Sequence, residues 1–144
     1  MADRPAFLDS NVICYLFGAD PAKANRAEEL LALRPTISVQ VLAEICNVAH
    51  RKAKLTWAEI EDVIDVVSAL CIVVPLTAEI QAEARVLAAR TGYTIYDAQI
   101  LAAAATAGCA FVWSEDLQDG HKMAGLGHPM AIRNPFVGED ERRV

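Results

Sequence analysis

The chain has 144 residues, a formal net charge of -6 and a hydrophobic content of 54%. This length fits one compact domain, and the hydrophobic content excludes an intrinsically disordered protein. No apolar run reaches the roughly 18 residues that a membrane span needs, and the first residues lack the basic stretch and apolar core of a secretory signal. We therefore expect a cytoplasmic protein that does not enter a membrane.

The acidic net charge argues against broad, sequence-independent binding to nucleic acid, which relies on many Lys and Arg contacts to phosphates. The acidic net charge does not exclude a localised site, because carboxylates gathered around a divalent cation also make the net charge of the chain negative. The four cysteines are scattered through apolar stretches without a Cys-x-x-Cys pair. We expect buried free thiols rather than a zinc or redox site.

Strands and helices are predicted to alternate along the chain. The expected strands are 5–8, 36–38, 71–74, 109–113 and 130–132, and the expected helices are 12–17, 21–34, 38–53, 56–70, 77–91 and 94–107. Asp20-Pro21 and the Thr56-x-x-Glu59 spacing are typical of helix starts, and Gly92 is typical of a helix end. Because the strands are continuously apolar, the pattern predicts an α/β sandwich around a mainly parallel sheet.

No stretch of the sequence has the composition of a linker between domains. We expect a single domain over residues 1–136, followed by a solvated tail over 137–144 that contains a Glu-Asp-Glu-Arg-Arg run.

Two aspartates follow predicted strands. Asp9 comes directly after the strand at 5–8, and Asp116 closely follows the strand at 109–113. If the sheet is parallel, both carboxylates lie at its carboxyl edge, where open α/β sheets place their binding sites. Taken alone, each Asp is better explained as a cap on the helix or turn that follows it.

Two further acids lie on predicted helices. Glu44 borders the apolar stripe of its helix, where burying a carboxylate costs free energy unless a cation or hydrogen-bond donors compensate. Asp97 lies in the first turn of a helix whose body is apolar apart from Gln99 and Thr106. Alone, Glu44 also fits a side chain that reaches solvent, and the Thr94-x-x-Asp97 spacing also fits a capping box.

Together, the four acids predict a metal site. Carboxylates that converge on one pocket repel one another and would in part protonate unless a divalent cation neutralised them. No Cys or His stands at ligand spacing, so Mg²⁺ or Mn²⁺ fits this set of oxygen ligands better than zinc.

Four segments carry a resemblance to a known family, in the family's order and approximate spacing. They are 7–13 (FLDSNVI), 41–45 (VLAEI), 96–100 (YDAQI) and 114–120 (SEDLQDG). Together they resemble the PIN-domain nucleases, and VapC-type toxins in particular, over nearly the whole chain. The resemblance implies a three-layer α/β/α sandwich with a short, mainly parallel sheet and metal-dependent endonucleolytic cleavage of RNA. It also implies frequent homodimers and a small cognate antitoxin as partner.

The resemblance assigns roles residue by residue. Asp9, Glu44 and Asp97 match the acids that look invariant to the motif, and Asp116 matches the fourth. All four are implied to be catalytic and to hold Mg²⁺ or Mn²⁺. Asn11 matches the polar residue that supports the first Asp.

The sequence departs from the family pattern around the fourth acid. Ser114 stands where the family often has Thr, and Glu115 and Asp119 flank Asp116. We expect Asp116 to approach the metal and Glu115 to be a solvated neighbour. Asp119, near Gly120, is expected to serve either a turn or a second metal.

The densest basic cluster follows the helix that carries Glu44. Its members are His50, Arg51, Lys52 and Lys54. Arg51, Lys52 and Lys54 are the candidates for contacts to RNA phosphates. The alternative is a solvated helix end whose cations complement the helix dipole.

Two other classes of function remain open at this point. A phosphate-binding or phosphoryl-transfer α/β domain also groups Asp residues at a sheet edge, although a dehalogenase-like enzyme has Asp-x-Asp after its first strand, whereas Asp9 is followed by Ser10 and Asn11. A non-catalytic PIN module would bind RNA or protein without cutting.

Overall fold

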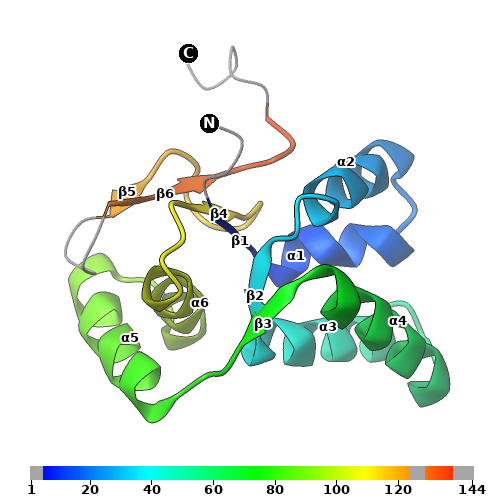
Figure 1. Cartoon of the computed structure of the whole chain (residues 1–144), viewed down its shortest axis with the longest axis horizontal. Helices are drawn as coiled ribbons and strands as arrows, with labels where there is room; N and C mark the ends of the chain where they lie inside the picture. The colour runs from blue at the N-terminus through cyan, green and yellow to red at the C-terminus, as the bar shows by residue number, and fades with distance from the viewer. Residues whose placement is uncertain (1–4, 124–128, 138–144) are drawn as a thin grey trace.

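The computed structural model describes residues 5–123 and 129–137, and a sheet flanked by helices forms its framework (Figure 1). The strands are β1 (Ala6–Leu8), β2 (Thr36–Ser38), β3 (Ile72–Val74), β4 (Phe111–Trp113), β5 (Lys122–Met123) and β6 (Met130–Arg133). The helices are α1 (Ser10–Ile13), the 3₁₀ helix η1 (Cys14–Phe17), α2 (Pro21–Leu31), α3 (Val39–Arg51), α4 (Trp57–Leu70), α5 (Ala78–Thr91) and α6 (Ile95–Thr106). The six strands of the described residues run in the order β3-β2-β1-β4-β6-β5. All neighbouring pairs are parallel except β5 with β6.

Helices cover both faces of the sheet. In Figure 1, α1 to α4 lie on one side and α5 and α6 on the other. The strand order explains this division, because β1, β2 and β3 step toward one edge and the chain then returns to place β4 on the other side of β1. Parallel crossovers are right-handed, so a reversal of direction moves the connecting helices to the opposite face. The expected α/β/α sandwich is confirmed.

The same reversal makes β1 and β4 neighbours at a topological switch point. Leu8 at the end of β1 is paired with Trp113 at the end of β4. The residues that follow, Asp9 and Ser114, therefore leave the sheet side by side at its carboxyl edge, where open α/β sheets bind their ligands.

Most helices match the expected boundaries to within two residues, and two of them differ more. The helix expected at 12–17 already begins at Ser10 and changes to 3₁₀ geometry at Cys14. Its early start follows from Asp9, whose carboxylate accepts a hydrogen bond from the first helical N–H. The helix expected to reach residue 34 ends at Leu31, and Arg34 has a left-handed φ of 55° that an α-helix does not accommodate. The short strand β5 was not predicted.

The core is formed by the strands and by residues from all six α-helices, of which α6 contributes the most. Seven of the twelve residues of α6 are buried, and five of these are alanines. Such small side chains allow α5 and the sheet to pack closely around this helix. All four cysteines are free; two are buried and two are half-buried, so the expectation of buried thiols holds for only two of them. None of the described helices combines the length and apolar character that a membrane crossing requires. Apart from residue 137, the expected tail over 137–144 lies outside the described residues.

Candidate metal centre

Asp9 is the most buried of the four candidate acids, with 5% of its surface exposed. Its Oδ1 accepts a hydrogen bond from the Ser10 N–H at 2.8 Å. Its Oδ2 accepts one from the Asn11 side-chain amide at 3.1 Å and one from the Ser114 hydroxyl at 2.9 Å. Asn11, which was expected to support the first acid, thus contacts it, and so does Ser114.

Side-chain contacts also join the segments that follow β1 and β4. Asn11 Nδ2 donates to Ser114 Oγ at 3.1 Å, and Asn11 Oδ1 accepts the Glu115 N–H at 3.0 Å. Ser114 Oγ accepts the Leu117 N–H at 3.3 Å. The position of Asp9 therefore depends on how the chain leaves β4.

Glu44 is half-buried on α3 and is connected to Asp9 through Ser10. The Ser10 hydroxyl donates to Glu44 Oε1 at 2.9 Å, while the Ser10 N–H binds Asp9. Gln40, one helical turn earlier, donates to Glu44 Oε2 at 3.4 Å. The sequence analysis assigned no role to Ser10 or Gln40. The signals available were the position of Ser10 beside Asp9 and the i, i+4 spacing of Gln40 and Glu44, which places both on one face of the helix.

Asp97 and Asp116 approach each other from different elements. Asp97 lies in the first turn of α6, where its N–H donates to Thr94 Oγ1 at 3.2 Å. Asp116 is exposed in the segment after β4. Burial raises the pKa of Asp97, and the nearby Asp116 charge raises it further. The structure thus brings the fourth acid close to the third.

The carboxylates share one electrostatic environment. The pKa of Asp9 is raised from 3.8 to about 6, mainly by burial and also by the charges of Glu44 and Asp97, against the hydrogen bonds from Ser114 and Ser10. Burial likewise raises the pKa of Glu44, and the Asp97 charge adds to the effect. A divalent cation among these groups would favour their ionised forms, and would therefore oppose the pKa increases caused by burial and by the neighbouring carboxylates.

These residues fit a hard divalent cation. All four offer carboxylate oxygens, the ligands that Mg²⁺ and Mn²⁺ prefer. Within 5–123 and 129–137, no three Asp, Glu, His or Cys side chains converge closely enough to hold an ion by themselves. Mg²⁺ usually keeps several water ligands and takes only one or two carboxylates directly, so such a loose group still suits it.

The acids that flank Asp116 have other partners. Asp119 Oδ1 accepts the Asn134 N–H at 2.7 Å, a contact that joins the segment after β4 to the end of β6. Glu115 was expected to be solvated, but only 25% of its side chain is exposed and it forms an ion pair with Lys23. This expectation was wrong because Lys23 is brought to Glu115 by the fold from 92 positions away.

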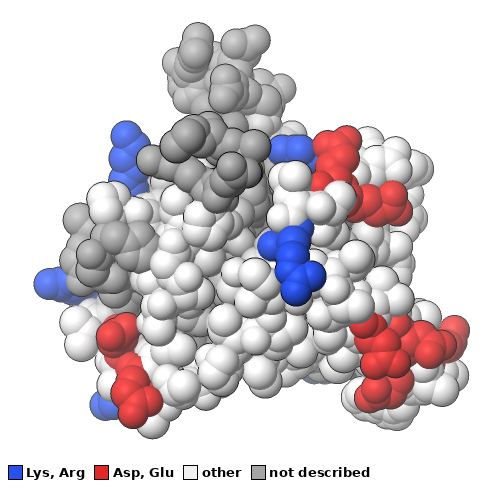
Figure 2. Space-filling view, in the orientation of Figure 1, with Lys and Arg blue, Asp and Glu red and all other residues white. Residues whose placement is uncertain are grey.

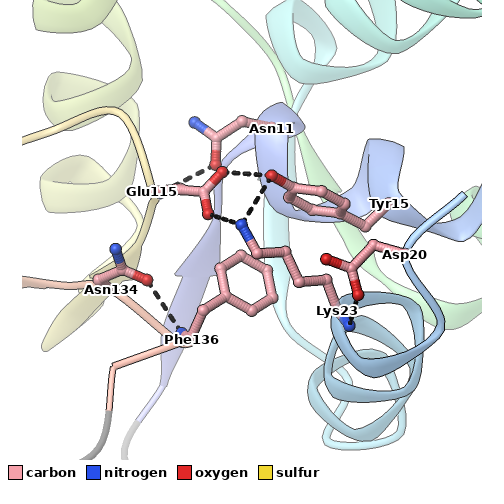
Figure 3. Close-up of polar contacts among 7 residues, drawn as sticks. All are labelled: Asn11, Tyr15, Asp20, Lys23, Glu115, Asn134 and Phe136. Carbon is pink, nitrogen blue, oxygen red and sulfur yellow. Dashed lines mark hydrogen bonds and ion pairs between the residues drawn. The ribbon is translucent and has the colours of Figure 1, made fainter. Parts of the chain in front are cut away.

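Glu115 belongs to a cluster that joins α2, η1 and the C-terminal segment (Figure 3). Besides the ion pair with Lys23, its carboxylate accepts the Tyr15 hydroxyl at 2.5 Å. Lys23 Nζ lies 4.8 Å from the centre of the Tyr15 ring and 5.0 Å from that of Phe136. Because Glu115 directly precedes Asp116, this cluster anchors the start of the segment that carries the fourth acid.

The candidate RNA contacts lie at the end of α3. All three, Arg51, Lys52 and Lys54, are exposed. Lys52 lines an open cavity of about 280 Å³ that also reaches Asn11, so one cation lies near the acidic site. Trp57, which is 59% exposed, stacks on His50 with ring centres 4.6 Å apart. On the face seen in Figure 2, acidic side chains gather over α2 and α4 and no broad basic surface is visible.

The fold and these carboxylates define an α/β domain with an acidic site at the carboxyl edge of its sheet. The family model described as the PIN domain matches residues 6–122. The chain belongs to the PIN domain family, as its four motifs suggested. A comparison with curated proteins finds no match.

Solved structures with this fold come from toxin–antitoxin systems. A DNA-bound VapBC from Salmonella typhimurium is similar with a TM-score of 0.67 and 20% identity, over 92% of this chain and 98% of that one. A toxin–antitoxin complex from Klebsiella pneumoniae has a TM-score of 0.66 and 19% identity, over 91% and 98%. Mycobacterium tuberculosis VapC20, described as a sarcin-ricin loop cleaving toxin, has a TM-score of 0.60 and 20% identity, over 77% and 89%. At these identities the likeness establishes a shared fold.

Proposed function

We propose that this chain is a Mg²⁺- or Mn²⁺-dependent endoribonuclease and the toxin of a toxin–antitoxin pair. One observation supports the nuclease proposal: in this PIN domain the buried Asp9 carboxylate follows β1 at the switch point of the sheet, and the charges of Glu44 and Asp97 raise its pKa. The toxin role is supported by the similar structures, two of which are toxin–antitoxin complexes and one of which is a toxin that cleaves the sarcin-ricin loop.

Each residue of the site has a distinct task in this proposal. Asp9, Glu44 and Asp97 hold the divalent cation, which when bound lowers the pKa of water and stabilises negative charge on a phosphate. Ser114 and Asn11 keep the Asp9 carboxylate in one orientation. Asp116, the most exposed of the four acids, either completes the cation site or accepts the proton of the attacking water.

The proposed partners follow from the same assignment. Single-stranded or looped RNA is the substrate, and Arg51, Lys52 and Lys54 contact its phosphates. A small antitoxin encoded beside the toxin binds the chain, and two copies of the chain form a homodimer. These partners are supported by the family and by the complexes that share its fold.

Cleavage of total cellular RNA by the purified chain tests the proposal. Wild type is assayed with Mg²⁺, with Mn²⁺ and with EDTA, alongside Asp9→Asn and Asp97→Asn. Asp65→Asn, an exposed change on α4, serves as the matched control. We expect cutting that needs the cation, that is lost in both site variants, and that persists in the control.

Equal cutting by wild type, Asp9→Asn and Asp97→Asn would mean that the observed activity comes from a contaminating nuclease. Together with an absence of Mn²⁺ binding, that result would contradict the nuclease proposal.

A further inference from the structure

A buried pair of amides connects the two helices that carry Glu44 and Asp97. Gln40 is 9% exposed in the first turn of α3. Its Oε1 accepts a hydrogen bond from Gln99 Nε2 at 2.9 Å. Gln99 is one of only two polar residues between Ala98 and Ala107, where an apolar side chain would be expected. The contact with Gln40 explains this exception in an otherwise apolar helix.

Besides Gln99, the Gln40 side chain contacts one residue of its own helix, α3, and one further residue of α6. Its Nε2 donates to Glu44 Oε2 at 3.4 Å and to the Tyr96 carbonyl at 3.0 Å. Tyr96 immediately precedes Asp97. Because α3 and α6 lie on opposite faces of the sheet (Figure 1), this single amide joins the two helical layers beyond the end of β2.

Two acceptors, the Glu44 carboxylate and the Tyr96 carbonyl, determine which way the Gln40 amide points, and Gln99 binds the oxygen that this orientation leaves. In the alternative orientation, Gln40 Oε1 would face the Glu44 carboxylate and the Tyr96 carbonyl, which are both acceptors. Gln99 Nε2 would then face a second NH₂ group. Only one orientation satisfies all four groups, and in that orientation Gln40 offers its two N–H bonds to Glu44 and Tyr96.

We propose that Gln40, supported by Gln99, is a positioning residue that sets the separation and orientation of Glu44 and Asp97 for a divalent cation. The proposal rests on the proposed function for the nature of that cation. Gln40 would not bind the cation itself. Its amide contacts Glu44 and the backbone beside Asp97, so it affects the cation through these two carboxylates. Outer hydrogen-bond partners of metal ligands typically contribute 10- to 100-fold in metal affinity.

The test measures Mn²⁺ binding to the RNA-free chain by electron paramagnetic resonance. Gln40→Met keeps the length of the side chain and removes its hydrogen bonds. Gln99→Met leaves the Gln40 contacts with Glu44 and Tyr96 in place and removes the hydrogen bond that Gln40 Oε1 accepts. Gln81→Met on α5, where the Gln81 side chain accepts a hydrogen bond from Arg85 far from the four candidate acids, is the matched control.

We expect the Kd for Mn²⁺ to rise about 10-fold or more in Gln40→Met, to rise less in Gln99→Met, and to stay unchanged in Gln81→Met. A second readout is RNA cleavage as a function of Mn²⁺ concentration. Excess Mn²⁺ should restore the cleavage rate of Gln40→Met. Urea unfolding in EDTA separates a loss of metal affinity from a loss of stability, because bound Mn²⁺ also stabilises the folded chain.

An unchanged Kd for Mn²⁺ in Gln40→Met would overturn the proposal. If Gln40→Met does not fold, the Gln99→Met variant decides, and a Kd equal to that of wild type would then overturn the proposal. Failure of the nuclease proposal gives a different result. In that case wild type binds Mn²⁺ without cutting RNA, and the Gln40 variant still binds it more weakly.

Discussion

At the scale of single residues, Asp9 shows a conflict between folding and chemistry. Its carboxylate is nearly excluded from water, and its pKa is raised to about 6. A shift of about two pKa units corresponds to roughly 3 kcal/mol of lost stability when the group is ionised. This loss of stability falls at the position where the proposed function needs an ionised ligand.

This conflict predicts how stability depends on pH in EDTA. The folded pKa of about 6 exceeds the ordinary value of 3.8, so the folded state binds more protons between these values. Stability contributed by the protonated form is therefore lost as pH rises from about 4 to 6. Urea unfolding should show that Asp9→Asn becomes more stable relative to wild type over this range, by about 2 kcal/mol. The exposed control Asp65→Asn should follow wild type at every pH.

Ser114 gives a second prediction at this scale. Its buried hydroxyl donates to Asp9 and accepts from Asn11 and Leu117. Ser114→Ala leaves these partners unsatisfied and should cost about 1–3 kcal/mol in urea unfolding, together with a loss of RNA cleavage. Ser114→Thr keeps the hydroxyl and should retain most of the activity. If the alanine variant matched wild type in both assays, the hydroxyl would have no part in holding Asp9.

At the scale of elements, the anchor at Glu115 determines how firmly the segment after β4 is held. Glu115 is bound through its carboxylate by Lys23 and Tyr15 and through its N–H by Asn11. Only the backbone contact survives when the side chain is removed. The segment that carries Asp116 then loses its connection to α2.

Glu115→Ala should therefore accelerate amide hydrogen exchange over 114–117 while exchange in α6 stays slow, because α6 is held by the buried core. Hydrogen exchange with mass-spectrometric detection measures both regions in one experiment. Glu61→Ala, an exposed change on α4, is the matched control and should alter neither. Equal exchange over 114–117 in wild type and Glu115→Ala would show that the side-chain anchor is dispensable.

At the scale of the whole molecule, the candidate ligands come from four separate parts of the chain. They follow β1 and β4 and lie on α3 and α6. A cation that contacts several of these parts binds only the folded chain, so its binding free energy adds to the stability of the entire domain. Metal binding and global unfolding are therefore coupled.

Thermal unfolding measures this coupling. A cation present at one hundred times its Kd stabilises the folded state by about 2.7 kcal/mol, which for a domain of this size raises Tm by several degrees. We expect this rise for wild type with Mn²⁺ and a much smaller rise for Asp97→Asn. An equal rise in both would place the bound ion elsewhere on the surface.

Local patterns in the sequence predicted the order of the elements and the parallel sheet, because apolar periodicity and capping residues act over a few positions. The same patterns placed Asp9 and Asp116 after strands. Contacts between distant positions were not predictable in this way. Ser10 reaches Glu44 across 34 positions, Gln99 reaches Gln40 across 59, and Lys23 reaches Glu115 across 92. Such pairs depend on how whole helices pack, which no short motif encodes.

The strand order also governs when this chain can become active during its own synthesis. β4 inserts between β1 and β6, although it follows β1 by about a hundred residues. A nascent chain that has left the ribosome only as far as residue 110 carries Asp9, Glu44 and Asp97. It lacks Ser114, Asp116 and β4, one of the two strands that pair with β1. Its first acid is then without the hydroxyl that orients it. Under the proposed function, the chain therefore stays inactive until β4 and the residues that follow it, Ser114 and Asp116, have been synthesised.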